Sequence, residues 1–184
     1  MKRVIYVEPI IDNLEIVDEL FRKYNPDSSF VNPHICLVFP FESNLSSKEI
    51  NKIFMSVLSN IESFNIKLSG LEISYEENNN FLFLNVIDEF GILRQMSSAL
   101  YNELGHNAQL KGIYKPHITI GKSRSINEIK KMEDDASILS TLVLNAKINK
   151  IYSKIMNKDD NGNIYLIDEL EFYLDDKKEH NIKK

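Results

Sequence analysis

PHICLVFPF, residues 33–41, is a proline-bounded apolar run with a histidine at its second position, and PHITIG, residues 116–121, repeats this pattern. The chain holds only four histidines, and two of them, His34 and His117, occupy the same place in these segments, 83 residues apart. Short apolar runs bounded by turn residues are typical of β-strands. We therefore predict two matched strands, each with a histidine near its start.

Side chains at positions i and i+2 of a strand point to the same face, about 6.6 Å apart along the chain. His34 therefore shares a face with Cys36, and His117 shares a face with Thr119. The aliphatic residues between them take the opposite face and are expected to hold each strand against the core. If a pseudo-twofold axis relates the two strands, both polar faces line one cleft.

The elements around each histidine strand follow the same order, which indicates a duplication carried by element order rather than by general similarity. In both halves a capping-box pair, Ser46 with Glu49 and Ser125 with Glu128, precedes the second helix. The predicted first half begins with a strand at 3–7 and a helix that starts at Asp12 or Asn13 and ends at Asn25. It continues with the strand at 33–41, a helix with apolar positions from Ile50 to Phe64, and a strand at 66–74 with a bulge at Gly70. The predicted second half comprises a strand at 81–87, a helix from Ile92 to Leu104 capped by Gly105, the strand at 116–121 and a helix from Ile126 to Met132. Strands at 141–152 and 164–173 follow, and the turn Asn161-Gly162 joins them.

The length of 184 residues fits one domain, which we expect to cover residues 1–174. The polar segment EENNN at 76–80 is interpreted as a tight turn, so the boundary of the pseudo-repeat is expected near 75–80. The tail at 175–184, DDKKEHNIKK, lacks apolar periodicity and is expected to be flexible.

Composition narrows the class of protein further. The net charge of -5 argues against a protein that tracks long duplex nucleic acid, because such binding rests on many phosphate contacts; a small phosphate ligand remains compatible. A single cysteine cannot form an internal disulfide and suits a reducing compartment. At the start of the chain, Glu8 and Pro9 interrupt the apolar run too early for a signal peptide or a membrane span. We expect a cytoplasmic monomer that does not enter a membrane.

Two imidazoles in one cleft suit phosphoester chemistry. Because the unperturbed pKa of histidine is near 6.5, the two rings can hold opposite protonation states at neutral pH, so that one accepts a proton and the other donates one. A hydroxyl or thiol beside each ring can hydrogen-bond the nonbridging oxygens of a phosphate. This chemistry requires neither a metal nor a cofactor.

Two H-x-[Thr/Ser]-x motifs about half a chain apart are the mark of the two-histidine phosphoesterases, and this chain resembles that superfamily. His117-Ile118-Thr119-Ile120 matches the motif fully, and residues 33–41 resemble the PHITLxFPF form of its 2'-5' RNA ligase-like branch. The similarity in the order of elements extends over residues 2–174. The chain departs from the pattern at Cys36, where a hydroxyl residue is expected and a thiol is the weaker hydrogen-bond donor.

The resemblance implies an α+β, bilobal duplicated fold, in which two antiparallel sheets with flanking helices surround a central cleft and the lobes exchange strands. It implies a phosphoesterase in which His34 and His117 are the catalytic acid and base, with Thr119 and Cys36 as phosphate contacts. Members of the superfamily act on 2',3'-cyclic phosphates, 2'-5' linkages or other cyclic phosphodiesters. The expected partner is therefore a nucleotide or the phosphate of an RNA end, and no metal or cofactor is expected.

Further residues near the second motif are candidates for substrate binding. Basic side chains there could create a local positive field for a phosphate, or they could form an ordinary solvated surface. These residues are Lys111, Lys115, Lys122 and Arg124. Tyr114 could stack on a base. Phe39 and Phe41 could do the same, although core packing explains them equally well.

Several alternatives remain open at this point. A histidine in an apolar strand is commonly a core residue, although the matched pair argues against that interpretation here. His34, Cys36 and His117 could hold zinc, yet the usual short ligand spacings are missing. Cys36 could be a nucleophile activated by His117. His106 and His180 are interpreted as exposed bystanders. A noncatalytic nucleotide- or RNA-binding module that keeps the cleft is the alternative function.

Overall fold

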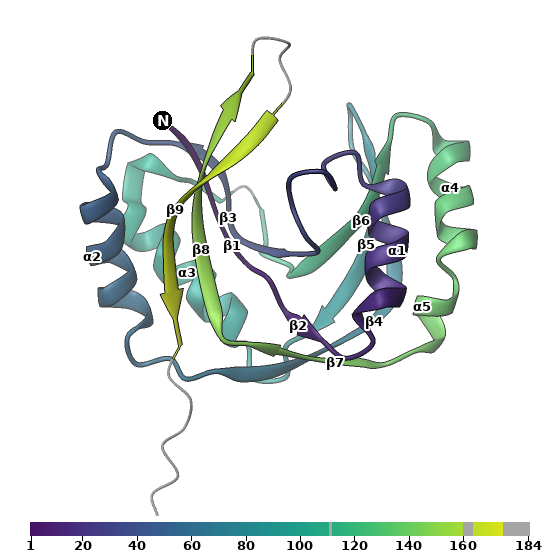
Figure 1. Ribbon diagram of the computed structural model, residues 1–184, viewed down its shortest axis with the longest axis horizontal. Helices are drawn as coiled ribbons and strands as arrows, with labels where there is room; N and C mark the ends of the chain where they lie inside the picture. The colour runs from purple at the N-terminus through teal and green to yellow at the C-terminus, as the bar shows by residue number, and fades with distance from the viewer. Residues whose placement is uncertain (111, 160–163, 175–184) are drawn as a thin grey trace, which may run out of the picture.

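The protein, described by a computed structural model over residues 1–110, 112–159 and 164–174, contains two antiparallel sheets with helices on their outer sides (Figure 1). This confirms the α+β fold class that the sequence predicted. The four-stranded sheet has the order β3 (Ile35–Glu42), β1 (Lys2–Val7), β8 (Lys150–Lys158), β9 (Ile164–Tyr173). The five-stranded sheet has the order β2 (Ile10–Ile11), β7 (Leu144–Ile148), β4 (Phe64–Tyr75), β5 (Asn80–Ile87), β6 (His117–Ser123).

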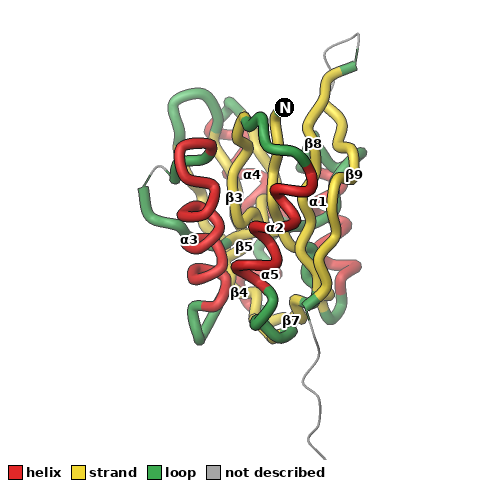
Figure 2. The backbone as a smooth tube through the Cα atoms, turned by 90° about the vertical axis from the view of Figure 1, so that its left-hand side faces the viewer, coloured by secondary structure: helices red, strands yellow, loops and turns green. Residues whose placement is uncertain are grey.

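Five α-helices occur in the described residues: α1 (Leu14–Tyr24), α2 (Ser47–Leu58), α3 (Ile92–Leu104), α4 (Ile126–Asp135) and the short α5 (Ile138–Thr141). A 3₁₀ turn, η1 (Gly105–Asn107), follows α3. Figure 2 looks from the side of α2 and α3 and shows both helices in front of the strands. Within the described part of the chain, no helix is long and apolar enough to cross a membrane.

The two halves of the chain exchange elements. β4, from the first half, pairs with β5 of the second half, and β8, near the end of the chain, pairs with β1 at its start. The helices cross over as well, because α1 packs against β6 and α3 packs against β3. Each histidine strand is therefore covered by a helix from the other half. The turn between β4 and β5 lies at residues 76–79, within the segment 75–80 where the boundary was expected.

Local signals in the sequence located most element ends. Ser46 and Glu49 form the reciprocal capping box at the start of α2. At the start of α4 only half of the box forms: Ser125 accepts from the Glu128 amide, whereas the Glu128 carboxylate accepts from the Ser123 hydroxyl. Gly70 has a φ of 81° and lies at a register shift between β4 and β5, which confirms the predicted bulge.

Other predictions of element ends were wrong or only partly right. The segment predicted as one strand at 141–152 is the end of α5 followed by β7 and β8, which belong to different sheets. Nothing local marks this change of sheet, because Asn149 is the sole residue between the two strands and neither glycine nor proline occurs there. α2 ends at Leu58, so Phe64 opens β4 instead of continuing the helix; Ser59 and Asn60 favour turns over helix interiors.

The start of α1 differs from expectation, and two other predicted features fall outside the described residues. Asn13 precedes α1 as predicted, yet it adopts a left-handed conformation with a φ of 58° and its side chain makes no capping hydrogen bond. The turn Asn161-Gly162 and the tail at 175–184 fall outside the described residues. β8 and β9, which flank that turn, pair in the antiparallel manner that was expected.

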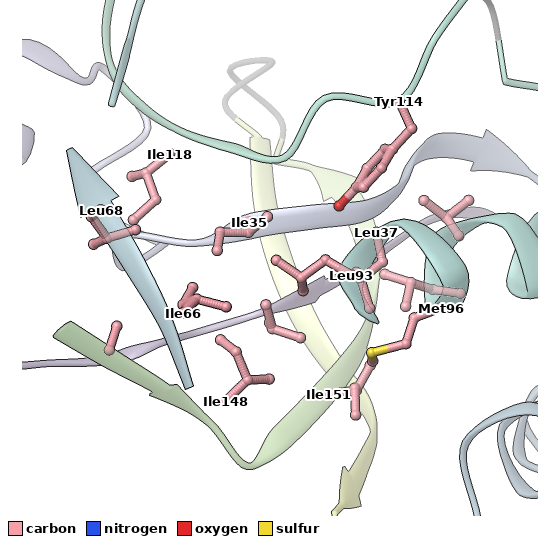
Figure 3. Packing of buried hydrophobic residues seen from close by; sticks show 14 of the residues in the cluster. Ile35, Leu37, Ile66, Leu68, Leu93, Met96, Tyr114, Ile118, Ile148 and Ile151 are labelled. Atoms are coloured by element: carbon pink, nitrogen blue, oxygen red, sulfur yellow. The ribbon is translucent and has the colours of Figure 1, made fainter. Parts of the chain in front are cut away.

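A continuous apolar core lies between the sheets and their helices. Ile35 and Leu37 of β3 are fully buried, and they belong to the same cluster as Leu93 and Met96 of α3 (Figure 3). Ile35 and Leu37 come from the strand of the first histidine motif, and Cys36 between them points to the opposite face. The core therefore fixes which face of β3 is left for the cleft.

A buried ion pair joins the two ends of the chain in the four-stranded sheet. The Arg3 guanidinium donates to both carboxylate oxygens of Glu169, and their side chains are 0% and 1% exposed. Arg3 also donates to the carbonyls of Ser43 and Leu45, and Ser153 donates to Glu169. Burial alone would raise the pKa of Glu169, but the hydrogen bonds from Arg3 and its neighbours outweigh it and hold that pKa below its ordinary value.

We predict that Arg3→Met lowers the free energy of unfolding by about 3–5 kcal/mol, because it leaves the Glu169 charge buried without its partner. The double variant Arg3→Met, Glu169→Leu should recover most of this loss, since it removes both charges together. Denaturant titration measures both effects. Lys67→Met, which breaks the half-exposed Lys67–Glu89 pair, is the control and should change stability little. A single variant as stable as wild type would contradict the prediction.

Candidate active site

One pocket of about 500 Å³ lies between the two sheets and contains both histidines of the repeated motifs. Its walls come from β3, β5 and β6, from the segment after α1 and from the turn after β4. The lining residues are Asn25, Asp27, His34, Cys36, Phe39, Pro40, Glu76, Phe81, Phe83, His117, Thr119 and Lys122. Of the seven residues selected from the sequence, His34, His117, Cys36, Thr119 and Lys122 thus meet at one site.

The two imidazoles are anchored in the same way. Nδ1 of His34 lies 2.8 Å from the carbonyl oxygen of Asn32, and Nδ1 of His117 lies 2.8 Å from that of Lys115. A carbonyl oxygen can only accept, so Nδ1 carries the proton in both rings. This leaves Nε2 of each ring as the nitrogen that can take or give a proton in the pocket.

An aromatic ring from the neighbouring strand packs against each histidine. Tyr6 of β1 lies 4.9 Å from His34 between ring centroids, and Phe83 of β5 stacks on His117 at 3.8 Å. The register makes these contacts equivalent, because Tyr6 is opposite Cys36 and Phe83 is opposite Thr119. Each half-site therefore holds its imidazole between a backbone carbonyl and an aromatic ring, which restricts ring rotation.

The pocket disfavours the charged form of both histidines. Burial lowers the pKa of His34 below its ordinary value, although the charges of Glu8 and Asp27 oppose this effect. Burial also lowers the pKa of His117, and a charge on His34 lowers it further. Protonation of one ring thus opposes protonation of the other, which favours states in which at most one of the two rings is charged.

Cys36 is a neutral thiol in this environment. Burial raises the pKa of its side chain to about 12, so the thiolate is scarce at neutral pH. This argues against a thiolate nucleophile. Within residues 1–110, 112–159 and 164–174, no group of three or more His, Cys, Asp or Glu side chains is arranged to hold a metal ion. The zinc alternative therefore finds no support in the donor geometry.

Lys122 is held at the pocket by Asp27. Its ammonium lies 2.7 Å from the Asp27 carboxylate, and the two side chains are 31% and 39% exposed. Asn25 prepares this contact, because its side chain accepts from the Asp27 amide and donates to the carbonyl of Thr119. The segment after α1 is thereby fastened to β6, although it belongs to the other half of the chain.

Two residues chosen from the sequence lie outside the pocket. Tyr114 is 5% exposed, and its hydroxyl donates to the carbonyl of Cys36 at 2.9 Å, so its ring cannot stack on a base (Figure 3). This corrects the prediction for Tyr114, whose hydroxyl instead braces the first motif. Lys115 extends away, pairs with Glu72 and does not line the pocket. Its backbone carbonyl, rather than its charge, contacts His117.

Of the remaining sequence candidates within the described residues, one lines the pocket and the others do not. Phe39 lines the pocket and is 40% exposed, whereas Phe41 is buried in the core. His106 is exposed and lies outside the pocket, and His180 falls outside the described residues. Sequence reasoning missed Tyr6 and Phe83, because their roles depend on which strands pair and in which register.

We predict that both His34 and His117 are Nδ1–H tautomers when neutral and titrate below pH 6.5, the ordinary value, because burial disfavours their cations. ¹⁵N chemical shifts of the imidazole nitrogens, followed against pH, report both properties. The variants His34→Ala and His117→Ala assign the signals. An Nε2–H tautomer, or a pKa above 6.5 for either ring, would contradict this arrangement.

Comparisons with known proteins agree with this fold. The structure of TT0787 of Thermus thermophilus matches this protein with a TM-score of 0.64 and 12% identity, over 97% of this chain and 100% of TT0787. It matches E. coli LigT complexed with 3'-AMP with a TM-score of 0.59 and 12% identity, over 94% of this chain and 97% of LigT. It matches Kluyveromyces marxianus Usb1 with a TM-score of 0.55 and 12% identity, over 91% and 97% of the two chains.

At such identities the solved structures establish the fold alone. No curated protein sequence gives a significant match. The model of the 2'-5' RNA ligase superfamily, however, matches residues 8–143, which include both histidine motifs and most of the chain. The protein therefore belongs to the 2'-5' RNA ligase superfamily.

Proposed function

We propose that the protein is a metal-independent phosphodiesterase that acts on a 2',3'-cyclic phosphate or a 2'-5' linkage at a nucleotide or RNA end. The observation that supports this most strongly is the matched anchoring of the two imidazoles, each with Nδ1 on a backbone carbonyl and Nε2 left for the pocket. Two such nitrogens suffice for acid and base catalysis of phosphoester cleavage.

In the proposed hydrolysis of a 2',3'-cyclic phosphate, one histidine takes a proton from water as its oxygen forms a bond to phosphorus. The other histidine gives a proton to the ribose oxygen as its bond to phosphorus breaks. The electrostatic effect of His34 on His117 opposes protonation of both rings at once, which fits a pair in which one ring acts as acid while the other acts as base. The near-symmetry of the half-sites is compatible with either assignment of acid and base.

Thr119 is proposed to donate its hydroxyl to a nonbridging phosphate oxygen, with the Cys36 thiol as its weaker counterpart. Phe81 and Lys122 are paired in register. Phe81 lies two residues from Phe83, about 7 Å along the strand, and Lys122 lies three residues from Thr119, because a register shift falls between the two pairs. We propose that a base lies between Phe39 and Phe81 while its ribose phosphate reaches Thr119. E. coli LigT has been crystallised with 3'-AMP and with ATP, which makes nucleotides the first compounds to test.

His34→Ala and His117→Ala should each lower turnover of the best substrate by roughly 10²- to 10⁴-fold, the usual contribution of a positioned acid or base. The assay is a panel of 2',3'-cyclic nucleotides and 2'-5' linked dinucleotides. His106→Ala, which changes an exposed histidine outside the pocket, is the matched control and should retain full activity.

Circular dichroism should show that all three histidine variants remain folded, since neither pocket histidine fills an apolar core position. A folded His34→Ala or His117→Ala variant with wild-type activity would rule out the acid–base pair. Nucleotide binding by the wild type without turnover of any compound in the panel would favour the noncatalytic binding module instead.

Cys36→Thr should preserve or raise activity, because threonine supplies a stronger hydrogen-bond donor at similar volume. EDTA should leave turnover unchanged in both wild type and variant. A nucleophilic thiol predicts loss of activity in Cys36→Thr, since a threonine hydroxyl has a far higher pKa and attacks poorly. A zinc site predicts loss on chelation and on removal of the thiol.

Thr119→Val is the complementary variant for the second half-site. It keeps the shape of the side chain and removes the hydroxyl, so turnover should fall while the fold is retained. Loss of activity in folded Cys36→Thr, or turnover that depends on a metal, would overturn the mechanism proposed above.

A further inference from the structure

A row of side chains continues from the pocket across the four-stranded sheet. Cys36 on β3 is opposite Tyr6 on β1, Tyr6 is opposite Tyr152 on β8, and Tyr152 is opposite Glu171 on β9. Directly opposed residues of antiparallel strands lie on the same face of a sheet. The face that carries His34 and Cys36 in the pocket is therefore the face that carries Tyr6 and Tyr152 farther out.

Lysines and tyrosines alternate on this face and touch one another. Tyr6 lies 4.9 Å from His34 and 5.6 Å from Tyr152 between ring centroids. The Lys154 ammonium is 5.9 Å from the Tyr6 ring and 5.3 Å from the Tyr152 ring. Lys150 is 5.1 Å from Tyr152 and 4.7 Å from Tyr173. We name Tyr6, Lys154, Tyr152, Lys150 and Tyr173 the tyrosine–lysine strip.

The outer end of the strip is open to solvent. Tyr173 is 63% exposed, and Lys150 is 22% exposed beside it. The inner end is covered, because Tyr6 is 1% exposed beneath its neighbours. In the sheet, β8 lies next to β1 and β9 lies beyond β8 (Figure 1), so the strip runs outward from the His34 side of the pocket. A ligand too long for the pocket would extend along Tyr152, Lys150 and Tyr173.

The chemistry of the strip fits a single-stranded nucleic acid. Aromatic rings stack on successive bases, and ammonium groups interleaved with them attract the phosphates between those bases. We propose that the outer part of the strip, Tyr152, Lys150 and Tyr173, binds single-stranded RNA next to the reacting phosphate, so that the preferred substrate is the end of an oligonucleotide rather than a mononucleotide. Tyr6 is covered and supports Tyr152 from the pocket side. The position of the reacting end rests on the function proposed above, whereas the binding of the strand does not.

Two carboxylates occupy the lysines in the free protein. Glu171 lies 3.1 Å from Lys150, and Asp168 lies 2.7 Å from Lys154. Asp168 is 74% exposed and Glu171 is 41% exposed, and such solvated ion pairs contribute little to stability. A phosphate can therefore replace a carboxylate at each ammonium, and the carboxylates limit affinity for the strand. Removal of either carboxylate should therefore strengthen RNA binding, whereas removal of a lysine should weaken it.

The experiment measures binding of a fluorescent single-stranded oligoribonucleotide of about six nucleotides with a 2',3'-cyclic phosphate end, by anisotropy with the full chain. Tyr173→Ala and Lys150→Ala should each weaken binding at least about fivefold, the smaller effect typical of losing one stacked base. Glu171→Gln should strengthen it. The matched control is Lys67→Ala on β4, where an ion pair of the same kind with Glu89 lies off the strip.

Two further readouts separate the strip from the catalytic pocket. Lys150→Ala should lower the slope of log affinity against log salt by about 0.7, the value for one phosphate contact on a single strand. In the same variant, the ratio of kcat/KM for the oligonucleotide to kcat/KM for a 2',3'-cyclic mononucleotide should fall. Wild-type RNA affinity in folded Lys150→Ala and Tyr173→Ala, or equal competition by a poly-glutamate peptide, would overturn the proposal. Absence of turnover with intact RNA binding would overturn the catalytic function alone.

Discussion

The alternation of side chains along the two histidine strands is the constraint on which the rest of the site depends. Ile35 and Leu37 on β3, and Ile118 and Ile120 on β6, are completely buried. Since a strand has a period of two, burial of these residues turns the histidines and their i+2 neighbours to the pocket. A shift of one residue in either strand would bury an imidazole and expose an isoleucine.

The exchange of elements between the halves holds the two walls of the pocket in a fixed relation. α1 covers β6 and α3 covers β3, while β4 pairs with β5 and β8 pairs with β1. Two side-chain hydrogen bonds reinforce this arrangement: Asn25 donates to the carbonyl of Thr119, and Tyr114 donates to that of Cys36. Because each motif is braced by the other half, the distance between the imidazoles does not depend on a flexible linker.

The two half-sites of the pocket match at the histidines but differ in the residues around them. Both rings bond a backbone carbonyl two residues earlier, yet Cys36 corresponds to Thr119, and Tyr6 corresponds to Phe83. The shared anchoring leaves Nε2 of either ring able to donate or to accept a proton, as the proposed function requires. The charge around the rings differs too: Glu8 and Asp27 outnumber Lys154 near His34, whereas Lys115 and Glu72 oppose each other near His117.

The sequence by itself indicated the duplicated order of elements and the pair of histidines, because these follow from local periodicity, helix caps and two matched tripeptides. The fold class followed from the resemblance of those motifs to the two-histidine phosphoesterases. The sequence also located the bulge at Gly70 and the capping box of Ser46, which depend on neighbouring residues alone. Only the tertiary structure decided that the segment around Asn149 changes sheets, that Tyr114 is a buried brace and that Tyr6 packs on His34. These features depend on which strands pair and in what register, and long-range pairing leaves no signal in the local sequence.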